Sequence, residues 1–377
     1  MSGFGIYVHW PYCAHLCPYC DFNVYRFRGG DHAPLLDAIC ADLREHASRF
    51  GRREAGSLFL GGGTPSLLAG RDIERLIEEA DDAFGLAADC EVTLEANPED
   101  VEHFAEQASA GVTRFSIGVQ ALDYASLKAL GRRHDCESGV AAVEAAAATG
   151  ERVSLDLIYA REGQGVEEWR RELTAALALP VEHVSLYQLT IEPDTAFARR
   201  VARGLLAPPD ADACAEFYEV TQDVCDAAGF PAYEISNHAR APLARSRHNL
   251  LYWRSHDWLG IGPGAHGRVT DGVRRIATEA QSRPQDYIGA VNQHGIGWLT
   301  NAELSGEEIA DELLLMGLRT GEGIDLKRFA ELRARPINPD AITWLGEQGL
   351  LVLNDARARL TARGRLLANK IAAELAC

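Results

Sequence analysis

Three of the nine cysteines fall within eight residues, at Cys13, Cys17 and Cys20. The segment leaves a short apolar run and contains a proline, so we expect a loop on which the three thiolates converge. A structural zinc normally collects four ligands, and His15 or His9 is then the candidate for the fourth. An iron-sulfur cube on three cysteines instead leaves one iron free to bind another molecule. The CxxxCxxC spacing favours the cluster over the zinc.

Composition excludes several classes of protein. The 377 residues carry 37 Lys plus Arg against 55 Asp plus Glu, a formal net charge of −18. Such acidity argues against a nucleic acid partner, because phosphate binding needs clustered cations. The longest apolar stretches, 140–149 and 173–179, are too short to span a bilayer. The first residues show no export signal, so we expect a cytoplasmic protein.

Short apolar or alternating runs recur between segments of helical periodicity. The runs, each expected as a strand, are 5–10, 57–60, 91–96, 113–119, 152–159 and 183–190. The helical segments are 35–50, 71–84, 101–110, 136–149 and 165–178. This order predicts an α/β fold of repeated β-α units around a parallel sheet. Six units are fewer than a closed barrel needs, so we expect an open partial (β/α)6 barrel over residues 1–206, with ligands at the carboxyl ends of its strands.

The pattern changes after residue 206. Pro208 and Pro209 precede an expected helix over 210–228, and a polar loop then holds most of the remaining aromatic residues. We therefore expect a linker region over 207–295. Residues 349–361 predict a hairpin before a last helix, 361–375, so the C-terminal domain, 296–377, should be mainly helical and resemble a winged helix. Winged helices often bind DNA, but the acidity of this chain favours a packing or partner role.

At the cysteine triplet, the sequence resembles the radical S-adenosylmethionine superfamily, whose signature is CxxxCxxC on the loop after the first barrel strand. The resemblance implies a [4Fe-4S] cluster on Cys13, Cys17 and Cys20. It also implies that the open iron is chelated by the amine and carboxylate of S-adenosylmethionine, from which the reduced cluster can generate a 5′-deoxyadenosyl radical. The cofactor carries the difficult chemistry, while the protein positions it and excludes water.

The string LGGGTPS at 60–66 directly follows the second expected strand. Successive glycines let a backbone approach a ligand closely, although a glycine run alone is as often a tight turn. In the superfamily that this chain resembles, the same place holds the methionine amine. The resemblance therefore assigns Gly62, Gly63 and Thr64 to S-adenosylmethionine.

Four polar residues lie where an apolar strand would not normally place them, namely Glu95, Gln120, Arg132 and Asp156. A lone polar residue at a strand end is more often a solvated or capping group. Four such residues at successive strand ends are harder to explain as solvated or capping groups. The resemblance implies that they bind the ribose hydroxyls and the methionine carboxylate, since carboxylates suit hydroxyls and arginine suits a carboxylate. It further implies that Tyr7 and Tyr19 lie against the nucleoside.

The sequence also resembles one branch of this superfamily, the coproporphyrinogen III oxidase-like proteins, through the strings YVHWPYC, CPYCDFN, GGGTPS, FSIGVQ, LGRRHD, VSLYQLTIEPDT, YEISNHA, RHNLLYW and GIGPGAHG. Two functions occur in the branch. The oxygen-independent coproporphyrinogen III dehydrogenase oxidatively decarboxylates propionates in heme synthesis, and the HemW-type proteins are heme chaperones. The dehydrogenase has a further cysteine two positions after the triplet, where this chain has Phe22.

The segment His248-Asn-Leu-Leu-Tyr252-Trp253 matches the HNxxYW string that marks the heme chaperones and is implicated in heme binding. Histidine is a common axial ligand of heme iron, and aromatic rings can pack on the macrocycle. On chemistry alone, a hydrogen-bonded loop histidine with core aromatics explains the string equally well. The alternative heme ligands are His9, His256 and His266, and the candidate partners of the propionates are Arg245, Arg247 and Arg254.

One segment departs from the branch. Relatives continue the fifth strand as DLIYGLPGQ, whereas this chain has DLIYAREGQ at 156–164. The change removes a glycine and a proline at the rim of the cofactor site and introduces Arg161 and Glu162. We therefore expect a different loop geometry there, with Asp156 retained.

Together these features predict a HemW-type heme chaperone that carries the cluster and S-adenosylmethionine and delivers heme to apo hemoproteins, such as respiratory membrane enzymes. A protein or membrane partner is compatible with this function, and a peripheral membrane position and a homodimer are left open. The alternatives are an enzyme, the coproporphyrinogen III dehydrogenase, and an interaction protein stabilised by zinc. The sequence does not decide whether S-adenosylmethionine is cleaved.

Overall fold

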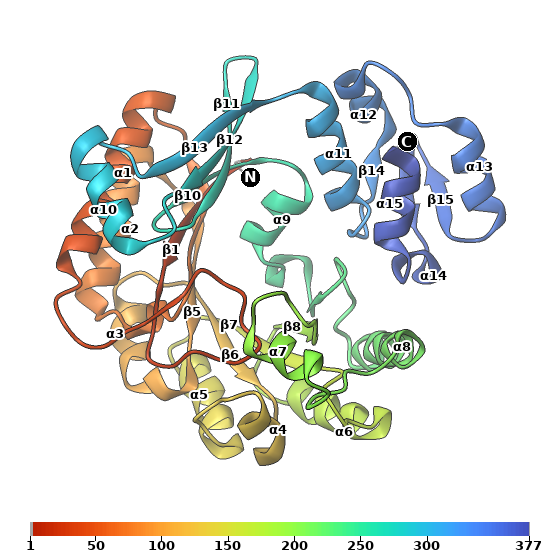
Figure 1. Cartoon of the computed structure of the whole chain (residues 1–377), viewed down its shortest axis with the longest axis horizontal. Helices are drawn as coiled ribbons and strands as arrows, with labels where there is room; N and C mark the ends of the chain where they lie inside the picture. The colour runs from red at the N-terminus through yellow and green to blue at the C-terminus, as the bar shows by residue number, and fades with distance from the viewer. Residues whose placement is uncertain (1–2, 377) are drawn as a thin grey trace.

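The computed structural model describes residues 3–376. Its largest element is an 11-stranded sheet in the order β13-β12-β11-β10-β1-β4-β5-β6-β7-β8-β9. The neighbouring strands from β10 through β1 and β4 to β8 run parallel. Helices cover the outer face of this sheet, and the strand order does not return to its start (Figure 1). The expected open, partial α/β barrel is therefore confirmed.

All six expected strands are present, as β1 (Phe4–Trp10), β4 (Ala55–Gly62), β5 (Leu86–Ala96), β6 (Arg114–Gln120), β7 (Arg152–Tyr159) and β8 (His183–Gln188). The helices that connect them are α1 (Ala33–Phe50), α2 (Gly70–Phe84), α3 (Phe104–Ser109), α4 (Tyr124–Ala129), α5 (Cys136–Ala148) and α6 (Val166–Leu177). Strand β1 is buried at six of its seven positions. A parallel strand covered on both faces reads as such a continuous apolar run.

The core between sheet and helices is closed by large aromatic side chains. Trp169 on α6 is fully buried, and its ring stacks on Tyr159 of β7 with a centroid distance of 5.2 Å. Its Nε1 donates a hydrogen bond to Thr221 Oγ1 on α8 (Ala211–Ala227) at 2.8 Å. The ring therefore joins α6 and α8 beside β7. The short helix α7 (Ala196–Ala202) lies between β8 and α8 in the chain.

The segment expected as a linker, 207–295, belongs largely to the barrel. It contains α8, β9 (Asn237–Ala239), α9 (Arg247–Trp253), β10 (Asp257–Ile261), β11 (His266–Asp271), β12 (Arg274–Ala280) and α10 (Pro284–His294). Strand β10 pairs with β1, and β11, β12 and β13 (Trp298–Leu304) extend the sheet antiparallel. The expected boundary at 296 therefore moves past β13. These strands lacked an apolar run, since β13 is exposed at five consecutive positions.

The C-terminal unit has a hydrophobic core of its own, which includes Leu313, Phe329 and Leu345. Its helices and strands are α11 (Gly306–Gly317), β14 (Ile324–Asp325), α12 (Leu326–Arg333), α13 (Pro339–Glu347), β15 (Leu351–Asn354), β16 (Arg357–Leu360), α14 (Ala362–Arg365) and α15 (Ala368–Ala376). The expected hairpin is β15–β16, in a three-stranded sheet with β14. The expected last helix is divided into α14 and α15. Three strands beside helices give the winged-helix-like arrangement.

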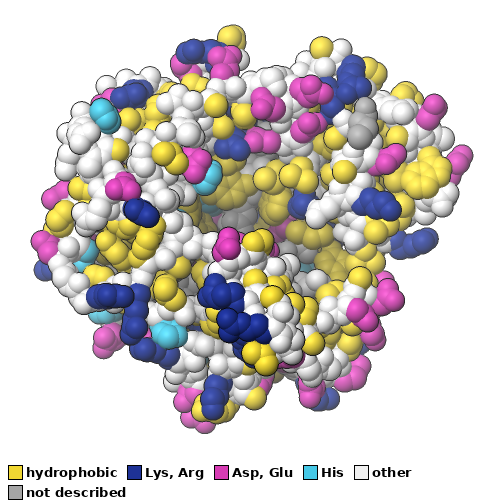
Figure 2. All heavy atoms as spheres, viewed as in Figure 1, with side chains coloured by type: hydrophobic (Ala, Val, Ile, Leu, Met, Phe, Trp, Pro, Cys, Tyr) yellow, Lys and Arg dark blue, Asp and Glu magenta, His cyan; other side chains and the backbone are white. Residues whose placement is uncertain are grey.

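Ion pairs join the C-terminal unit to the barrel. Arg254, just after α9, pairs with Glu322 at 2.5 Å, and Arg268 on β11 pairs with Glu312 at 2.7 Å. Figure 2 shows the surface hollowed between the two units, with hydrophobic side chains in the hollow and carboxylates spread over the outer surface. Among the helices described, none is long and apolar enough to cross a membrane.

Candidate cofactor site

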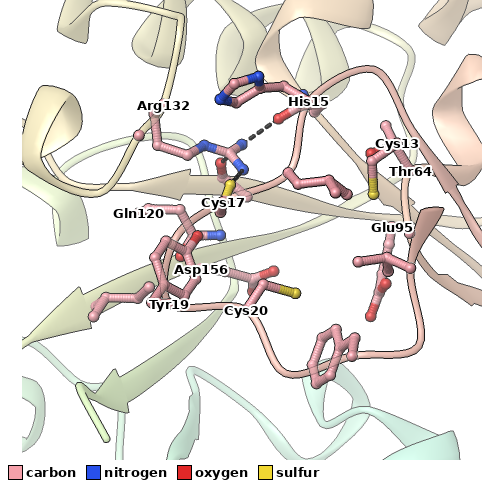
Figure 3. A pocket seen from close by; sticks show the side chains of 18 of the residues that line it. Cys13, His15, Cys17, Tyr19, Cys20, Thr64, Glu95, Gln120, Arg132 and Asp156 are labelled. Atoms are coloured by element: carbon pink, nitrogen blue, oxygen red, sulfur yellow. Dashed lines mark hydrogen bonds between the residues drawn. The ribbon is translucent and has the colours of Figure 1, made fainter. Parts of the chain in front are cut away.

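A cavity of about 380 Å³ opens at the carboxyl ends of the barrel strands. This is the place where the fold predicts ligands, and the volume suits a small-molecule site. Most of the predicted cofactor residues line it together, and Figure 3 shows Cys13, Cys17, Tyr19, Cys20, Thr64, Glu95, Gln120, Arg132 and Asp156 around it. Gly62 and Gly63 line it as well.

The three cysteines line this cavity. Cys13 ends the two-residue strand β2 (Tyr12–Cys13), which pairs with β3 (Tyr25–Arg26) and closes the loop between them. Cys13 is buried, whereas Cys17 and Cys20 are half-buried. Burial raises the pKa of the Cys13 thiol, and it raises the pKa of Cys20 to about 11, so both are protonated at neutral pH. Bound iron favours thiolates, so cluster binding would release these protons.

The donor set fits a cluster better than a zinc ion. Among residues 3–376, no three His, Cys, Asp or Glu side chains are arranged around a single metal position. In a cube each cysteine holds its own iron, so thiols spread around a cavity are what a cluster requires. His9, one candidate for a fourth zinc ligand, has Nδ1 2.9 Å from Tyr7 Oη and Nε2 2.9 Å from the Asn23 carbonyl. Both of its ring nitrogens are therefore occupied.

The cysteine loop is anchored by residues from much later in the chain. Asn23 Nδ2 donates hydrogen bonds to the carbonyl oxygens of Pro263 at 2.9 Å and Ser282 at 2.8 Å. Tyr25 Oη donates to the same Ser282 carbonyl at 3.2 Å. Gly264 has φ +80, and a Cβ there would lie 2.4 Å from Asn23 Nδ2. The segment around β10 to β12 thus holds the loop that carries the cysteines.

The glycine turn after β4 is fixed against the cysteine loop. The amide of Gly63 donates to the Trp10 carbonyl at 2.6 Å, and the amide of Thr64 donates to the Tyr12 carbonyl at 2.8 Å. A Cβ on Gly63 would lie 2.6 Å from that Tyr12 oxygen, and Gly62 has φ +107. Only glycine allows both the close approach and the left-handed backbone. The turn and the loop therefore form one rigid cradle.

Glu95 and Asp156 reach the cavity from β5 and β7. Glu95 Oε2 accepts a hydrogen bond from the amide of Gly62 at 2.8 Å, and Asp156 accepts one from Ser116 Oγ at 3.0 Å. Burial raises the pKa of Glu95 to about 7 and that of Asp156 to about 6, and repulsion from Asp156 adds to the effect on Glu95. A cationic ligand with hydroxyl groups would favour both ionised forms.

Gln120 and Arg132 complete the wall opposite the glycine turn. Gln120 ends β6 with φ +71, a conformation that costs a non-glycine residue free energy and is concentrated at functional sites. Arg132 donates hydrogen bonds to the Gly118 carbonyl at 2.7 Å and to Asn97 Oδ1, and its Nη1 lies 3.7 Å from Cys17 Sγ. These contacts hold the guanidinium next to a predicted cluster ligand.

A second cavity of about 250 Å³ lies deeper in the barrel. Glu95, Asp156 and Tyr187 line both cavities. The Tyr187 side chain lies deep in the barrel, where burial raises its pKa, yet it is 46% exposed because it borders the open space of both cavities. We call this second cavity the inner chamber. Its polar lining continues the cofactor site inward.

The HNLLYW string forms helix α9, and the expectation of a polar loop is wrong. The Ser246 side chain accepts a hydrogen bond from the Asn249 amide and caps the helix. His248 is buried against the inner chamber, with Nδ1 2.9 Å from Ser57 Oγ and Nε2 2.6 Å from Tyr252 Oη. Burial lowers the pKa of His248 to about 3, so the ring is neutral with one donor and one acceptor nitrogen. Both are engaged, which leaves no free lone pair for a heme iron.

The other aromatic and histidine candidates are dispersed. Tyr7 lines the inner chamber and Tyr19 lines the cavity of the cysteines, and the contact of either ring with a nucleoside stays a prediction. Trp253 is half-buried at the end of α9. His256 is half-buried and His266 is exposed, and neither lines the two cavities.

The arginines beside the HNLLYW string contact other parts of the protein. Arg247 pairs with Asp89 at 3.0 Å, and Arg254 pairs with Glu322 at 2.5 Å. Arg245 lies over the Tyr233 ring, 5.6 Å from its centroid. In this structure they connect elements of the barrel and the C-terminal unit, so propionate pairing would displace existing contacts.

The loop after β7, whose sequence differs from that of relatives, is held by a buried ion pair. Ala160 has φ +55, which explains why a glycine suits this position in relatives. Arg161 is 6% exposed, and it donates to Glu172 Oε2 on α6 and to the Ile158 carbonyl, each at 2.6 Å. Glu172 also accepts from the Leu122 amide at 2.7 Å. The new pair therefore joins the loops after β6 and β7 to α6.

The residues of the site that were not predicted include Asn97, Ser116 and Tyr187. Asn97 orients the predicted arginine, and Ser116 donates to the β7 carboxylate. Ser116 shares a strand face with Gln120, so alternation along β6 was the signal that could have found it. Aromatic residues are common in strands, so nothing in the local sequence identifies Tyr187 as a residue that lines the cavity.

The fold and the cysteine-lined cavity define a radical S-adenosylmethionine protein, and residues 7–175 match the Radical SAM superfamily. Residues 304–367 match the HemN C-terminal domain. The fold superposes on coproporphyrinogen III oxidase (HemN) from Escherichia coli with a TM-score of 0.81 at 21% identity, covering 99% of this chain and 90% of that one. At this identity the likeness concerns the fold alone.

Sequence relatives define the branch. The chain is 33% identical to the heme chaperone HemW of Bacillus subtilis, over 97% of each protein, and 40% identical to that of Escherichia coli over 75% of each. It is 38% identical to the mitochondrial radical S-adenosyl methionine domain-containing protein 1 of Bos taurus, over 96% of this chain and 84% of the relative. The chain therefore belongs to the HemW family of radical S-adenosylmethionine proteins.

Proposed function

We propose that this protein is a heme chaperone that binds heme and transfers it to apo hemoproteins, with respiratory enzymes as the acceptors. The observation that carries the proposal is the similarity, over nearly the whole chain, to proteins named heme chaperone HemW. Phe22, in place of the further cysteine of the dehydrogenase, supports it. A membrane-bound acceptor and a homodimer stay predictions.

Cys13, Cys17 and Cys20 would hold a [4Fe-4S] cluster, which supplies the one-electron chemistry of the superfamily when it is bound. The protein contributes the rigid cradle of the cysteine loop and the glycine turn. The Arg132 guanidinium, already fixed beside Cys17, adds a positive charge that offsets the negative charge of thiolate-ligated iron.

S-adenosylmethionine would bind beside the cluster. Glu95 and Asp156, once ionised, can accept hydrogen bonds from ribose hydroxyls, and their charges favour the nearby sulfonium. The Gly62–Thr64 turn brings backbone groups close to the ligand without side chains in between. Gln120 and Arg132 provide an amide and a cation for the amino acid end.

The test is anaerobic reconstitution with iron and sulfide, followed by heme titration and transfer to an apo hemoprotein. A brown protein that binds heme at micromolar concentration and loads the acceptor supports the proposal. Failure to bind heme with the cluster intact would exclude it. On the same preparation, conversion of coproporphyrinogen III in the presence of S-adenosylmethionine and a reductant would identify the dehydrogenase instead, and a colourless zinc-loaded protein would identify the interaction protein.

A further inference from the structure

The mouth of the cluster cavity carries apolar side chains that neither the cluster nor S-adenosylmethionine explains. Phe22 is 61% exposed and Leu16 is 43% exposed, and both line this cavity together with Val24. All three belong to the segment that carries the cysteines, Leu16 directly before Cys17 and Phe22 and Val24 shortly after Cys20, and all three border the same cavity. Large apolar side chains that stay exposed at a cavity mouth mark a binding surface.

Two polar groups at the same opening have no role in binding the cluster or S-adenosylmethionine. His15 and Arg133 both line the cavity, with His15 half-buried and Arg133 exposed. Neither makes a side-chain hydrogen bond or an ion pair within residues 3–376. Figure 3 shows the His15 imidazole on the side of Arg132 and away from Cys20. The opening therefore combines an apolar surface, an unengaged imidazole and an unpaired cation.

We propose that heme docks on this mouth, with one face of its ring on Phe22 and Leu16, its iron bound by His15, and a propionate paired with Arg133. The inference rests on the heme-binding function proposed above. A flat apolar ring with a metal at its centre and carboxylates at its edge matches this combination of groups. His248 is a poorer ligand, because both of its nitrogens are bonded inside the barrel.

The position has a second consequence. A ring that lies across the mouth covers the cavity predicted for S-adenosylmethionine. Bound heme should therefore slow the exchange of S-adenosylmethionine, even though the two ligands use different side chains.

The first experiment compares binding of heme and of metal-free protoporphyrin to the reconstituted protein. Phe22→Asp should weaken both ligands about tenfold or more, because the ring loses its apolar support. Phe22→Leu should stay close to wild type. Trp344→Asp is the matched control, since Trp344 is an exposed aromatic residue (53%) on the C-terminal unit, and it should change neither affinity. Retained absorbance of the cluster shows that each variant is assembled.

The second experiment separates iron ligation from ring packing. His15→Ala should change the Soret spectrum of bound heme and weaken heme, while it leaves the affinity for metal-free protoporphyrin unchanged. His248→Gln should leave the heme spectrum unchanged. Exchange of labelled S-adenosylmethionine, measured with and without heme, should slow when heme is bound in wild type and much less in Phe22→Asp.

The outcomes distinguish this inference from the proposed function. If wild type binds heme and Phe22→Asp and His15→Ala bind it with the same affinity and spectrum, the mouth is not the site, although the chaperone function stands. A loss confined to His248→Gln would move the site to α9. Wild type that binds no heme would overturn both.

Discussion

Replacing Glu95 with glutamine measures the free energy with which the barrel disfavours the carboxylate. Glu95 accepts a hydrogen bond from the amide of Gly62, and a glutamine carbonyl can accept the same bond. Burial raises the pKa of Glu95 from 4.5 to about 7. Glutamine resembles the protonated acid and does not titrate, so the comparison isolates the ionisation of this group.

Because folding raises the pKa of Glu95, this carboxyl lowers the free energy of unfolding as the pH rises. Below pH 4.5 the carboxyl is protonated in both the folded and the unfolded chain, so it contributes no pH dependence. As the pH rises to about 7 the unfolded chain ionises first, and the folded state loses stability; above 7 the loss is constant. The step from 4.5 to about 7 corresponds to about 3 kcal/mol. The advantage of Glu95→Gln over wild type should therefore grow from about 1 kcal/mol at pH 5 to about 3 kcal/mol at pH 8.

Urea unfolding followed by tryptophan fluorescence at pH 5, 6.5 and 8 provides the assay. It uses protein prepared without cluster or S-adenosylmethionine, so that no ligand contributes to the free energy of unfolding. Glu99→Gln is the control, because it removes the same charge from an exposed side chain that lines the same cavity. A difference between Glu95→Gln and wild type that is the same at all three pH values would refute the burial argument.

Three further predictions concern the loops around the site. Arg161→Ala leaves the Glu172 carboxylate without its ion-pair partner, so it should lower the free energy of unfolding by about 3 kcal/mol. Arg170→Ala, which breaks an exposed ion pair, should lower it by less than about 1 kcal/mol. Equal effects of the two substitutions in urea unfolding would contradict this. Ala160→Gly relieves a positive φ and should raise the free energy of unfolding by up to about 1 kcal/mol, and a lower melting temperature would count against it. Gly63→Ala places a Cβ against backbone carbonyls and should reduce the iron and sulfide bound per chain, so full loading would show that the cradle tolerates a side chain.

The barrel strands were predictable from sequence because burial on both faces leaves an apolar run, as in β1. Strands β11 to β13 were not predictable, since they lie at one end of the sheet, where β13 is exposed at five consecutive positions and carries no apolar run. The pairing of β10 with β1 joins Phe4 to Asp257, and no local pattern records a contact over such a separation.

The residues that line the cavity together could be predicted in large part, because cysteines, glycines and acids stand in short strings with recognisable spacing. The orientation of His248 could not. A helix offers several faces, and the face that becomes buried depends on its neighbour, here Ser57 on β4, which lies 191 positions away. The cavity that Tyr7 lines could not be predicted for a similar reason, since alternation on β1 does not tell which of two neighbouring cavities a side chain enters.

The anchoring of Asn23 by Pro263 and Ser282 has a consequence for biogenesis. The ribosome makes the three cysteines first and their anchors far later. A nascent chain that ends before residue 263 contains every thiol that the cluster needs, yet it lacks both carbonyls that order the loop. Iron delivered at that stage would meet mobile thiols and no cradle. Metal loading therefore belongs after most of the polypeptide has left the ribosome, and a truncated chain should be unable to retain the cluster.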